Sequence, residues 1–104
     1  MEQVSDPRWP FDVPPDEAVL TTKYVTAQHM PILLVMHQVD EEDGVIWQFH
    51  CDNDDYRSEV LQLVQLKEVL ALDSTVESLA SMPTGYTARR ERVGEAWNIQ
   101  EDRE

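Results

Sequence analysis

The feature that most constrains the fold of this chain is an acidic turn, Asp40-Glu41-Glu42-Asp43-Gly44, placed between two apolar segments. The first segment, residues 32–36, follows Pro31, which prevents a helix from running into it. The second segment, residues 45–51, alternates apolar and polar residues, and Gly44 before it can adopt a positive φ. This arrangement predicts a β-hairpin whose first strand, residues 32–36, is central and buried on both faces.

Alternation in the second segment assigns side chains to the two faces of the predicted sheet. Successive residues of a strand point to opposite sides, so Trp47, Phe49 and Cys51 share one face. Ile46, Gln48 and His50 share the other face. We expect the aromatic side to face the core.

Other segments complete a small domain. Further strands are predicted at residues 18–22 and 61–66, and an edge segment at 96–99, whereas residues 86–92 fit either a polar strand or a loop. Residues 23–28 fit either a helical turn or a continuation of the first strand. A short helical turn is expected from Lys67 onward, and then a second helix capped by Asp73 or Ser74. The sequence therefore predicts an α+β fold, mainly an antiparallel sheet with one or two short helices packed on one face.

The chain divides into three parts. Residues 1–17 form a proline-rich arm, and its Trp9-Pro10-Phe11 either packs on the domain, as we expect, or forms an exposed docking peptide. Residues 18–99 form a single α+β domain, and the charged tail 100–104 is expected to fray. The predicted core consists of Ile32, Leu34, Trp47, Phe49, Leu66, Val69, Val76 and Leu79.

The net negative charge of the chain disfavours some classes of binding partner. Eight Lys and Arg residues face twenty-one Asp and Glu, a net charge of −13 among 104 residues. Such a surface repels nucleic acids and anionic lipids and attracts basic surfaces, although acidity also serves plain solubility. The N-terminus lacks the pattern of a signal peptide, and the longest apolar run is too short to span a bilayer. A single cysteine, Cys51, prevents an intramolecular disulfide, so we expect a cytoplasmic protein.

No catalytic, metal-binding or cofactor-binding motif is present in the sequence. Three glycines do not form a phosphate-binding loop. His37 and His50 could meet across the hairpin, but His50 and Cys51 point to opposite faces of a strand and cannot share one metal. We therefore predict a non-enzymatic protein without cofactors. The alternatives are a small ligand-binding or enzymatic domain with a His and carboxylate cleft, and a housekeeping accessory protein.

Two acidic clusters are the candidate partner-binding residues. The first is the turn with Asp40, Glu41, Glu42 and Asp43, and the second is the loop with Asp52, Asp54 and Asp55. A hairpin places them at opposite ends of its second strand. Tyr56, Tyr86 and Trp97 are candidate aromatic anchors, because Tyr and Trp are enriched at interface hot spots. The acidic clusters could instead be solvated loops, and each aromatic residue could instead be a half-buried packing residue. A cationic cluster, Arg89, Arg90 and Arg92, lies apart from both acidic clusters.

The order of these motifs resembles a bacterial domain-of-unknown-function family, also classed as immunity protein thirty-three of polymorphic toxin systems. The resembling features are Asp43-Gly44, the pair Trp47 and Phe49, the acidic loop at 52–55, Leu72-Asp73-Ser74, and Pro83 and Gly85 before Ala88-Arg89. Two features depart from the family pattern: Ile46, not glycine, precedes Trp47, and the acidic loop lacks a glycine. The resemblance implies a divergent member or sister group that neutralises a basic, toxin-like protein by binding it.

Overall fold

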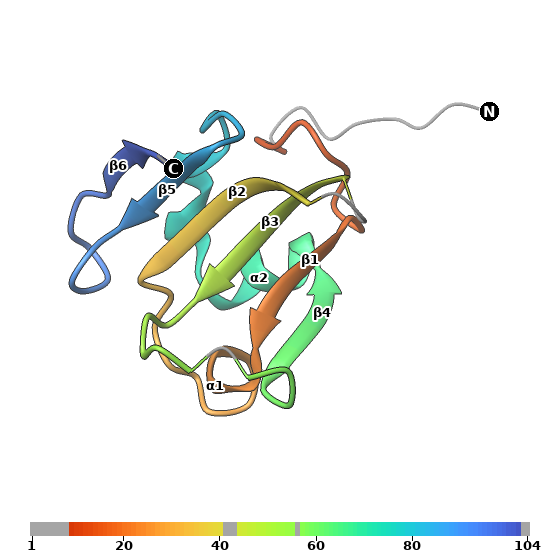
Figure 1. Ribbon diagram of the computed structural model, residues 1–104, viewed down its shortest axis with the longest axis vertical. Helices are drawn as coiled ribbons and strands as arrows, with labels where there is room; N and C mark the ends of the chain where they lie inside the picture. Colours follow the sequence, from red (N-terminus) through yellow and green to blue (C-terminus); the bar gives the residue numbers. More distant parts are fainter. Residues whose placement is uncertain (1–8, 41–43, 56, 103–104) are drawn as a thin grey trace.

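A single six-stranded sheet with short helices behind it forms the body of the molecule (Figure 1). The computed structural model describes residues 9–40, 44–55 and 57–102. Its strand order is β4-β1-β3-β2-β5-β6. The strands are β1 (Ala18–Thr22), β2 (Leu34–Asp40), β3 (Gly44–His50), β4 (Leu61–Gln65), β5 (Tyr86–Arg89) and β6 (Asn98–Glu101). The predicted α+β class with a mainly antiparallel sheet is confirmed; β1 and β3 are the one parallel pair among the described strands.

The predicted hairpin is present as β2 and β3. Asp40 pairs with Gly44, and Gly44 has a φ of 77°, the left-handed conformation that a side chain disfavours. Turn residues 41–43 lie outside the described residues. The first strand begins later than predicted: Ile32 is buried before β2 starts, and its carbonyl oxygen accepts hydrogen bonds from the Arg90 side chain.

Three short helical segments contribute to the core: α2 (Leu66–Leu72) and the 3-10 helix η1 (Ser74–Leu79), which pack on one face of the sheet, and α1 (Lys23–Thr26), which follows β1 directly. Residues 23–28 thus begin with a helical turn and do not continue β1. A capping box between Gln65 and Glu68 begins α2, and the Asp73 carboxylate accepts the Thr75 backbone N–H at 3.0 Å to begin η1. Asp73, one of the two predicted caps, therefore performs this role.

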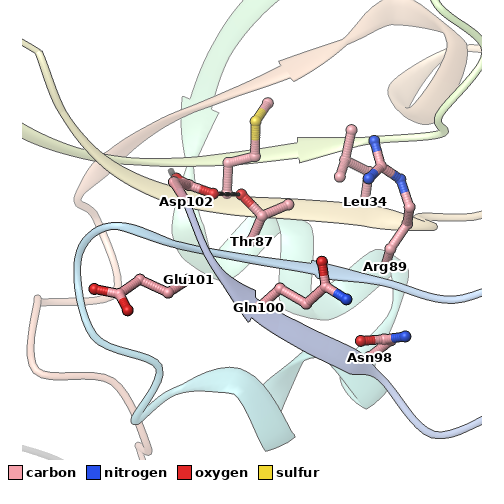
Figure 2. Close-up of a pocket in the computed structure, with 8 residues that line it drawn as sticks. Leu34, Thr87, Arg89, Asn98, Gln100, Glu101 and Asp102 are labelled. Atoms are coloured by element: carbon pink, nitrogen blue, oxygen red, sulfur yellow. Dashed lines mark hydrogen bonds between the residues drawn. The ribbon is translucent and has the colours of Figure 1, made fainter. Parts of the chain in front are cut away.

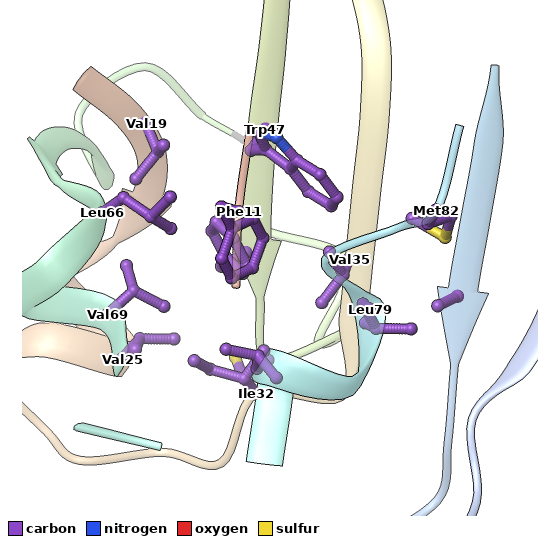
Figure 3. Close-up of a cluster of buried hydrophobic side chains, with 14 residues drawn as sticks. Phe11, Val19, Val25, Ile32, Val35, Trp47, Leu66, Val69, Leu79 and Met82 are labelled. Atoms are coloured by element: carbon purple, nitrogen blue, oxygen red, sulfur yellow. The ribbon is translucent and has the colours of Figure 1, made fainter. Parts of the chain in front are cut away.

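The core lies between the sheet and these helices (Figure 3). All the predicted core residues are buried, and all but Leu34 belong to this core: Ile32, Trp47, Phe49, Leu66, Val69, Val76 and Leu79. Leu34 is buried on the other face of the sheet, beside His50 and Arg89. Phe11 joins the core from the N-terminal arm and packs edge-on against Trp47, with ring centroids 5.2 Å apart and planes at 84°. The expectation that the Trp9-Pro10-Phe11 segment packs on the domain is confirmed for Phe11.

The expectation of a frayed tail is wrong for residues 100–102. Gln100 pairs with Thr87 and Glu101 with Tyr86, and the Asp102 backbone N–H donates to the Gly85 carbonyl oxygen at 2.7 Å. Without β6 the polar groups along one edge of β5 would lack partners, and pairing satisfies them. Charged composition alone did not reveal this pairing. Within the described ranges, no helix is long and apolar enough to cross a membrane.

Candidate partner-binding surface

The two faces of the sheet differ in what covers them. Helices α2 and η1 pack on one face, whereas Figure 1 shows the sheet from its other side, in front of α2. We call this other side the open face. Strand register and alternation place the following described residues on it: Leu20, Leu34, Met36, Gln38, Ile46, Gln48, His50, Leu61, Leu63, Thr87, Arg89, Asn98, Gln100 and Asp102.

A row of uncharged residues crosses the open face from one edge of the sheet to the other. Cross-strand pairs connect its members in the order Leu63, Leu20, Gln48, Met36, Thr87 and Gln100. We call it the central row. Adjacent strands lie about 4.8 Å apart, so a row over six strands extends roughly 24 Å. Charged residues make up 28% of the chain, yet Arg89 and Asp102 are the charged residues at the open-face positions given above. The middle of this face is therefore neutral in a strongly anionic protein.

A depression of about 1080 Å³ occupies the β2, β5 and β6 side of the open face (Figure 2). Leu34, Met36 and Thr87 contribute to its lining, and the amides of Asn98 and Gln100 come from the edge strand β6. Asp102 and Arg89 lie at opposite ends of the depression in Figure 2. The depression therefore combines the apolar side chains of Leu34 and Met36 with polar ones, and it has the carboxylates of Glu101 and Asp102 toward one end and Arg89 at the other.

His50 adds a polar but neutral group to the open face. Its side chain is buried, and Nε2 lies 3.0 Å from the Gln48 Oε1 atom. Burial lowers the pKa of His50, and the nearby Asp52 carboxylate opposes that shift. The imidazole is consequently neutral at physiological pH.

The predicted acidic loop is largely paired with cations of the same chain. The Asp52 carboxylate accepts the Arg89 Nε–H at 3.2 Å, and Asp55 accepts two hydrogen bonds from the Arg57 side chain, both at 2.8 Å. Tyr24 Oη also donates to Asp55 at 2.5 Å. The Arg57 bonds, and then the Tyr24 bond, hold the pKa of Asp55 well below its usual range. Asp54 is exposed, and no side chain of the described residues pairs with it. The loop thus offers a partner less free charge than its sequence indicates.

Of the acidic residues in the predicted turn, only Asp40 belongs to the described residues. Asp40 closes β2 opposite Gly44, whereas Asp52 follows the far end of β3, so these two residues lie at opposite ends of β3. Glu41, Glu42 and Asp43 lie outside the described residues.

The predicted aromatic anchors are partly used inside the molecule. Tyr86 and Trp97 are half-buried and pack against the core, and the Arg90 guanidinium carbon lies 4.0 Å from the centre of the Trp97 ring. Tyr56 lies outside the described residues. Neither Tyr86 nor Trp97 is presented as a free anchor.

The predicted cationic cluster of arginines does not form one surface. Arg90 is buried, donates to the Ile32 carbonyl oxygen and the Thr75 hydroxyl, and pairs with Asp73 at 2.8 Å. Arg89 pairs with Asp52 on the open face, and Arg92 pairs with Glu95. The charge of each arginine is therefore matched within the chain.

No protein-family model matches the chain, and no curated protein or solved structure matches it significantly. The resemblance to the immunity family therefore stays a prediction.

The alternative of a shared histidine cleft does not fit the geometry. His37 pairs with Trp47 on the helix-covered face, stacks on its ring at 3.8 Å, and makes a 2.8 Å hydrogen bond from Nδ1 to the Met82 carbonyl oxygen. His50 pairs with Leu34 on the open face. Burial raises the pKa of the Cys51 thiol, which disfavours a nucleophilic thiolate. In the described part of the chain, no group of three or more His, Cys, Asp or Glu residues could hold a metal ion.

Sequence reasoning missed the central row. Alternation in β3 correctly placed Gln48 and Ile46 on the face opposite Trp47. The signal that could have revealed the row is the lack of charge at alternate positions of several strands, since interface centres are depleted in charged residues.

Proposed function

We propose that this chain is a non-catalytic protein-binding module that presents its open face to a basic protein. The observation that carries this proposal is the central row, a neutral row over six strands in a chain of net charge −13. Monomeric surfaces carry charge to stay soluble, whereas the centre of an interface is depleted in charge and its rim is polar.

The exposed apolar residues on the face support a binding role. Leu63 of β4 is 64% exposed at one end of the central row, and Leu20 and Met36 are half-buried within it. Partner residues that cover these side chains would remove apolar surface from water, a gain of about 25 cal/mol per Å².

The size of the face indicates that bordering loops take part. Six strands and three rows of side chains cover roughly 500 Å². A stable interface buries about 800 Å² on each partner. The exposed Asp54, in the loop after β3, is placed to contribute to an anionic rim beside the neutral centre, which would accelerate association with a basic partner. In this arrangement the predicted acidic residues act at the rim and not as the main anchor.

In line with the sequence resemblance, we propose that the basic partner is a toxin-like protein that the module neutralises by covering its surface. Neutralisation of this kind requires no reaction centre, only a rigid and complementary surface. A six-stranded sheet with a packed core supplies such rigidity.

A matched pair of leucine variants tests the proposed surface. Leu63→Lys places a cation on the open face, and Leu72→Lys makes the same change on α2, where Leu72 is 43% exposed. The tagged chain is used to capture partners from cells that produce it, at about 50 and about 500 mM NaCl, and the captured protein is identified. We expect a basic protein that Leu63→Lys loses and Leu72→Lys retains, with less capture at high salt.

Neutralisation is then tested with the captured protein itself. Its production alone should arrest growth, and its production together with the wild-type chain should not. Equal capture by the two leucine variants would refute the open face as the binding surface, and a captured protein that is harmless would refute the toxin-neutralising role.

A further inference from the structure

We propose that the depression between β2, β5 and β6 receives an arginine side chain, and that Asp102 is its anchor. This inference rests on the proposed function, because the arginine would be supplied by the basic partner. The depression would then be the specificity pocket at one end of the central row.

Asp102 differs from other aspartates of the chain in how it is held. Asp52, Asp55 and Asp73 each pair with an arginine. Asp102 instead accepts hydrogen bonds from two neutral groups, the Thr87 hydroxyl at 2.6 Å and the Gln38 amide at 3.1 Å. No lysine or arginine of the described residues forms an ion pair with it. Its carboxylate is therefore oriented on the open face, and no cation among residues 9–40, 44–55 and 57–102 compensates its negative charge.

The other residues of the depression suit a guanidinium better than an ammonium. Within the described chain, no group hydrogen-bonds to the side-chain amides of Asn98 and Gln100, so both amides are available to accept donors from a ligand. A guanidinium carries five N–H donors in one plane and binds a carboxylate through two parallel hydrogen bonds, whereas an ammonium acts as a point charge. Met36 and Thr87 provide an apolar surface for the aliphatic part of the side chain.

Arg89 determines which end of the depression accepts the cation. Its guanidinium lies at the end opposite Asp102 in Figure 2 and pairs with Asp52 at 3.2 Å. The Arg89 end carries no free negative charge, because Arg89 and Asp52 pair with each other, whereas Glu101 and Asp102 place two carboxylates at the other end, so the incoming guanidinium is directed to the Asp102 end. One end therefore attracts the ligand and the other fixes its orientation.

The test uses a small probe and does not need the partner. N-acetyl-arginine methylamide is titrated into labelled protein while NMR follows the Met36 methyl group and the side-chain amides of Asn98 and Gln100. The citrulline analogue removes the charge at nearly constant shape, and the lysine analogue replaces the planar fork by a point charge. We expect the arginine probe to shift these signals at millimolar concentration and to bind more tightly than either analogue.

Two substitutions that each remove one negative charge test whether Asp102 is the residue that binds the guanidinium. Asp102→Asn should weaken the arginine probe about fivefold, as expected for loss of one charged hydrogen-bonding partner. Asp54→Asn removes the same charge from an exposed loop position and should change affinity less than about twofold. Gln100→Arg fills the depression with a cation and should abolish the shifts without altering Asp102, which protects the test if Asp102→Asn disturbs β6.

Several outcomes would overturn the proposal. These are equal effects of the Asp102 and Asp54 substitutions, shifts spread over the 52–55 loop, equally tight binding of either analogue, and no localised shift at any concentration tested. Failure of the probe together with loss of capture by Leu63→Lys would refute the arginine pocket alone. Localised probe binding with capture unaffected by Leu63→Lys would refute the proposed binding face instead.

Discussion

The two faces of the sheet are built from alternate residues of the same strands, yet they are completed differently. On the helix-covered face, Trp47 contacts Phe11, His37 and Phe49 through its ring and is 4% exposed. On the open face, Gln48, the next residue, belongs to a neutral row that includes half-buried and exposed apolar side chains. The first face is covered within the chain, whereas the second leaves apolar side chains such as Leu63 exposed.

Two adjacent arginines show the same contrast: Arg89 is the last residue of β5, and Arg90 follows it. The Arg90 side chain is 1% exposed and satisfied by a carbonyl, a hydroxyl and a carboxylate, with Trp97 against its plane. The Arg89 side chain is 60% exposed and donates a hydrogen bond to Asp52. The same residue type therefore stabilises the fold on one side and lines a depression on the other.

The largest expected effect is on the helix-covered face. Trp47→Ala should lower the free energy of unfolding by about 3–5 kcal/mol, because it removes a buried ring that packs against three others. Leu63→Ala on the open face should cost less than about 1 kcal/mol, since its side chain is already exposed. Urea unfolding measures both. Comparable losses would show that the open face supports the fold as much as the covered face does.

The neighbouring arginines give the next largest difference. Arg90→Met should cost about 3 kcal/mol, because it leaves the Asp73 carboxylate and the Ile32 carbonyl oxygen without their buried partner. Arg89→Met should cost less than about 1 kcal/mol, because its ion pair is solvent-exposed. Urea unfolding of the two variants under one set of conditions makes the comparison. A small loss at Arg90 would mean that the helices retain their positions without this buried pair.

The sequence was most informative where strand alternation alone decides the outcome. Alternation in 45–51 placed Trp47 and Phe49 on the core side because consecutive side chains of a strand must diverge. The acidic turn with Gly44 determined the hairpin for a similarly local reason. The class of the fold and its core could therefore be predicted.

Contacts between distant residues could not be predicted in the same way. The Asp52–Arg89 pair connects residues 37 positions apart, and the Tyr24–Asp55 hydrogen bond spans 31 positions. These contacts reduce the free charge of the acidic loop, which the sequence presents as fully available. The central row likewise depends on the strand order, which places Leu20 of β1 beside Gln48 of β3. No local pattern encodes that order.

A smaller effect should appear in the pH dependence of the free energy of unfolding, and it comes from His50 on the open face. Burial lowers the pKa of His50 in the folded chain, whereas the unfolded histidine titrates near about 6.5. Below about pH 6.5 the unfolded state therefore binds more protons at this position, so the stability that neutral His50 contributes is present above that pH and is lost as the pH falls. The free energy of unfolding should decline less steeply in His50→Gln than in the wild type between about pH 7 and pH 5.5. Parallel declines would show that His50 keeps an ordinary pKa.

The smallest expected effect is the most informative about the open face. Leu63→Lys should change the free energy of unfolding by less than about 0.5 kcal/mol, because the side chain is 64% exposed and the added charge reduces the net charge of −13. The same substitution should abolish capture of the basic partner. A surface that tolerates a charge without loss of stability but loses its partner is maintained for binding. A destabilisation comparable to that of Trp47→Ala would instead show that Leu63 is needed for folding and would remove the distinction between the two faces.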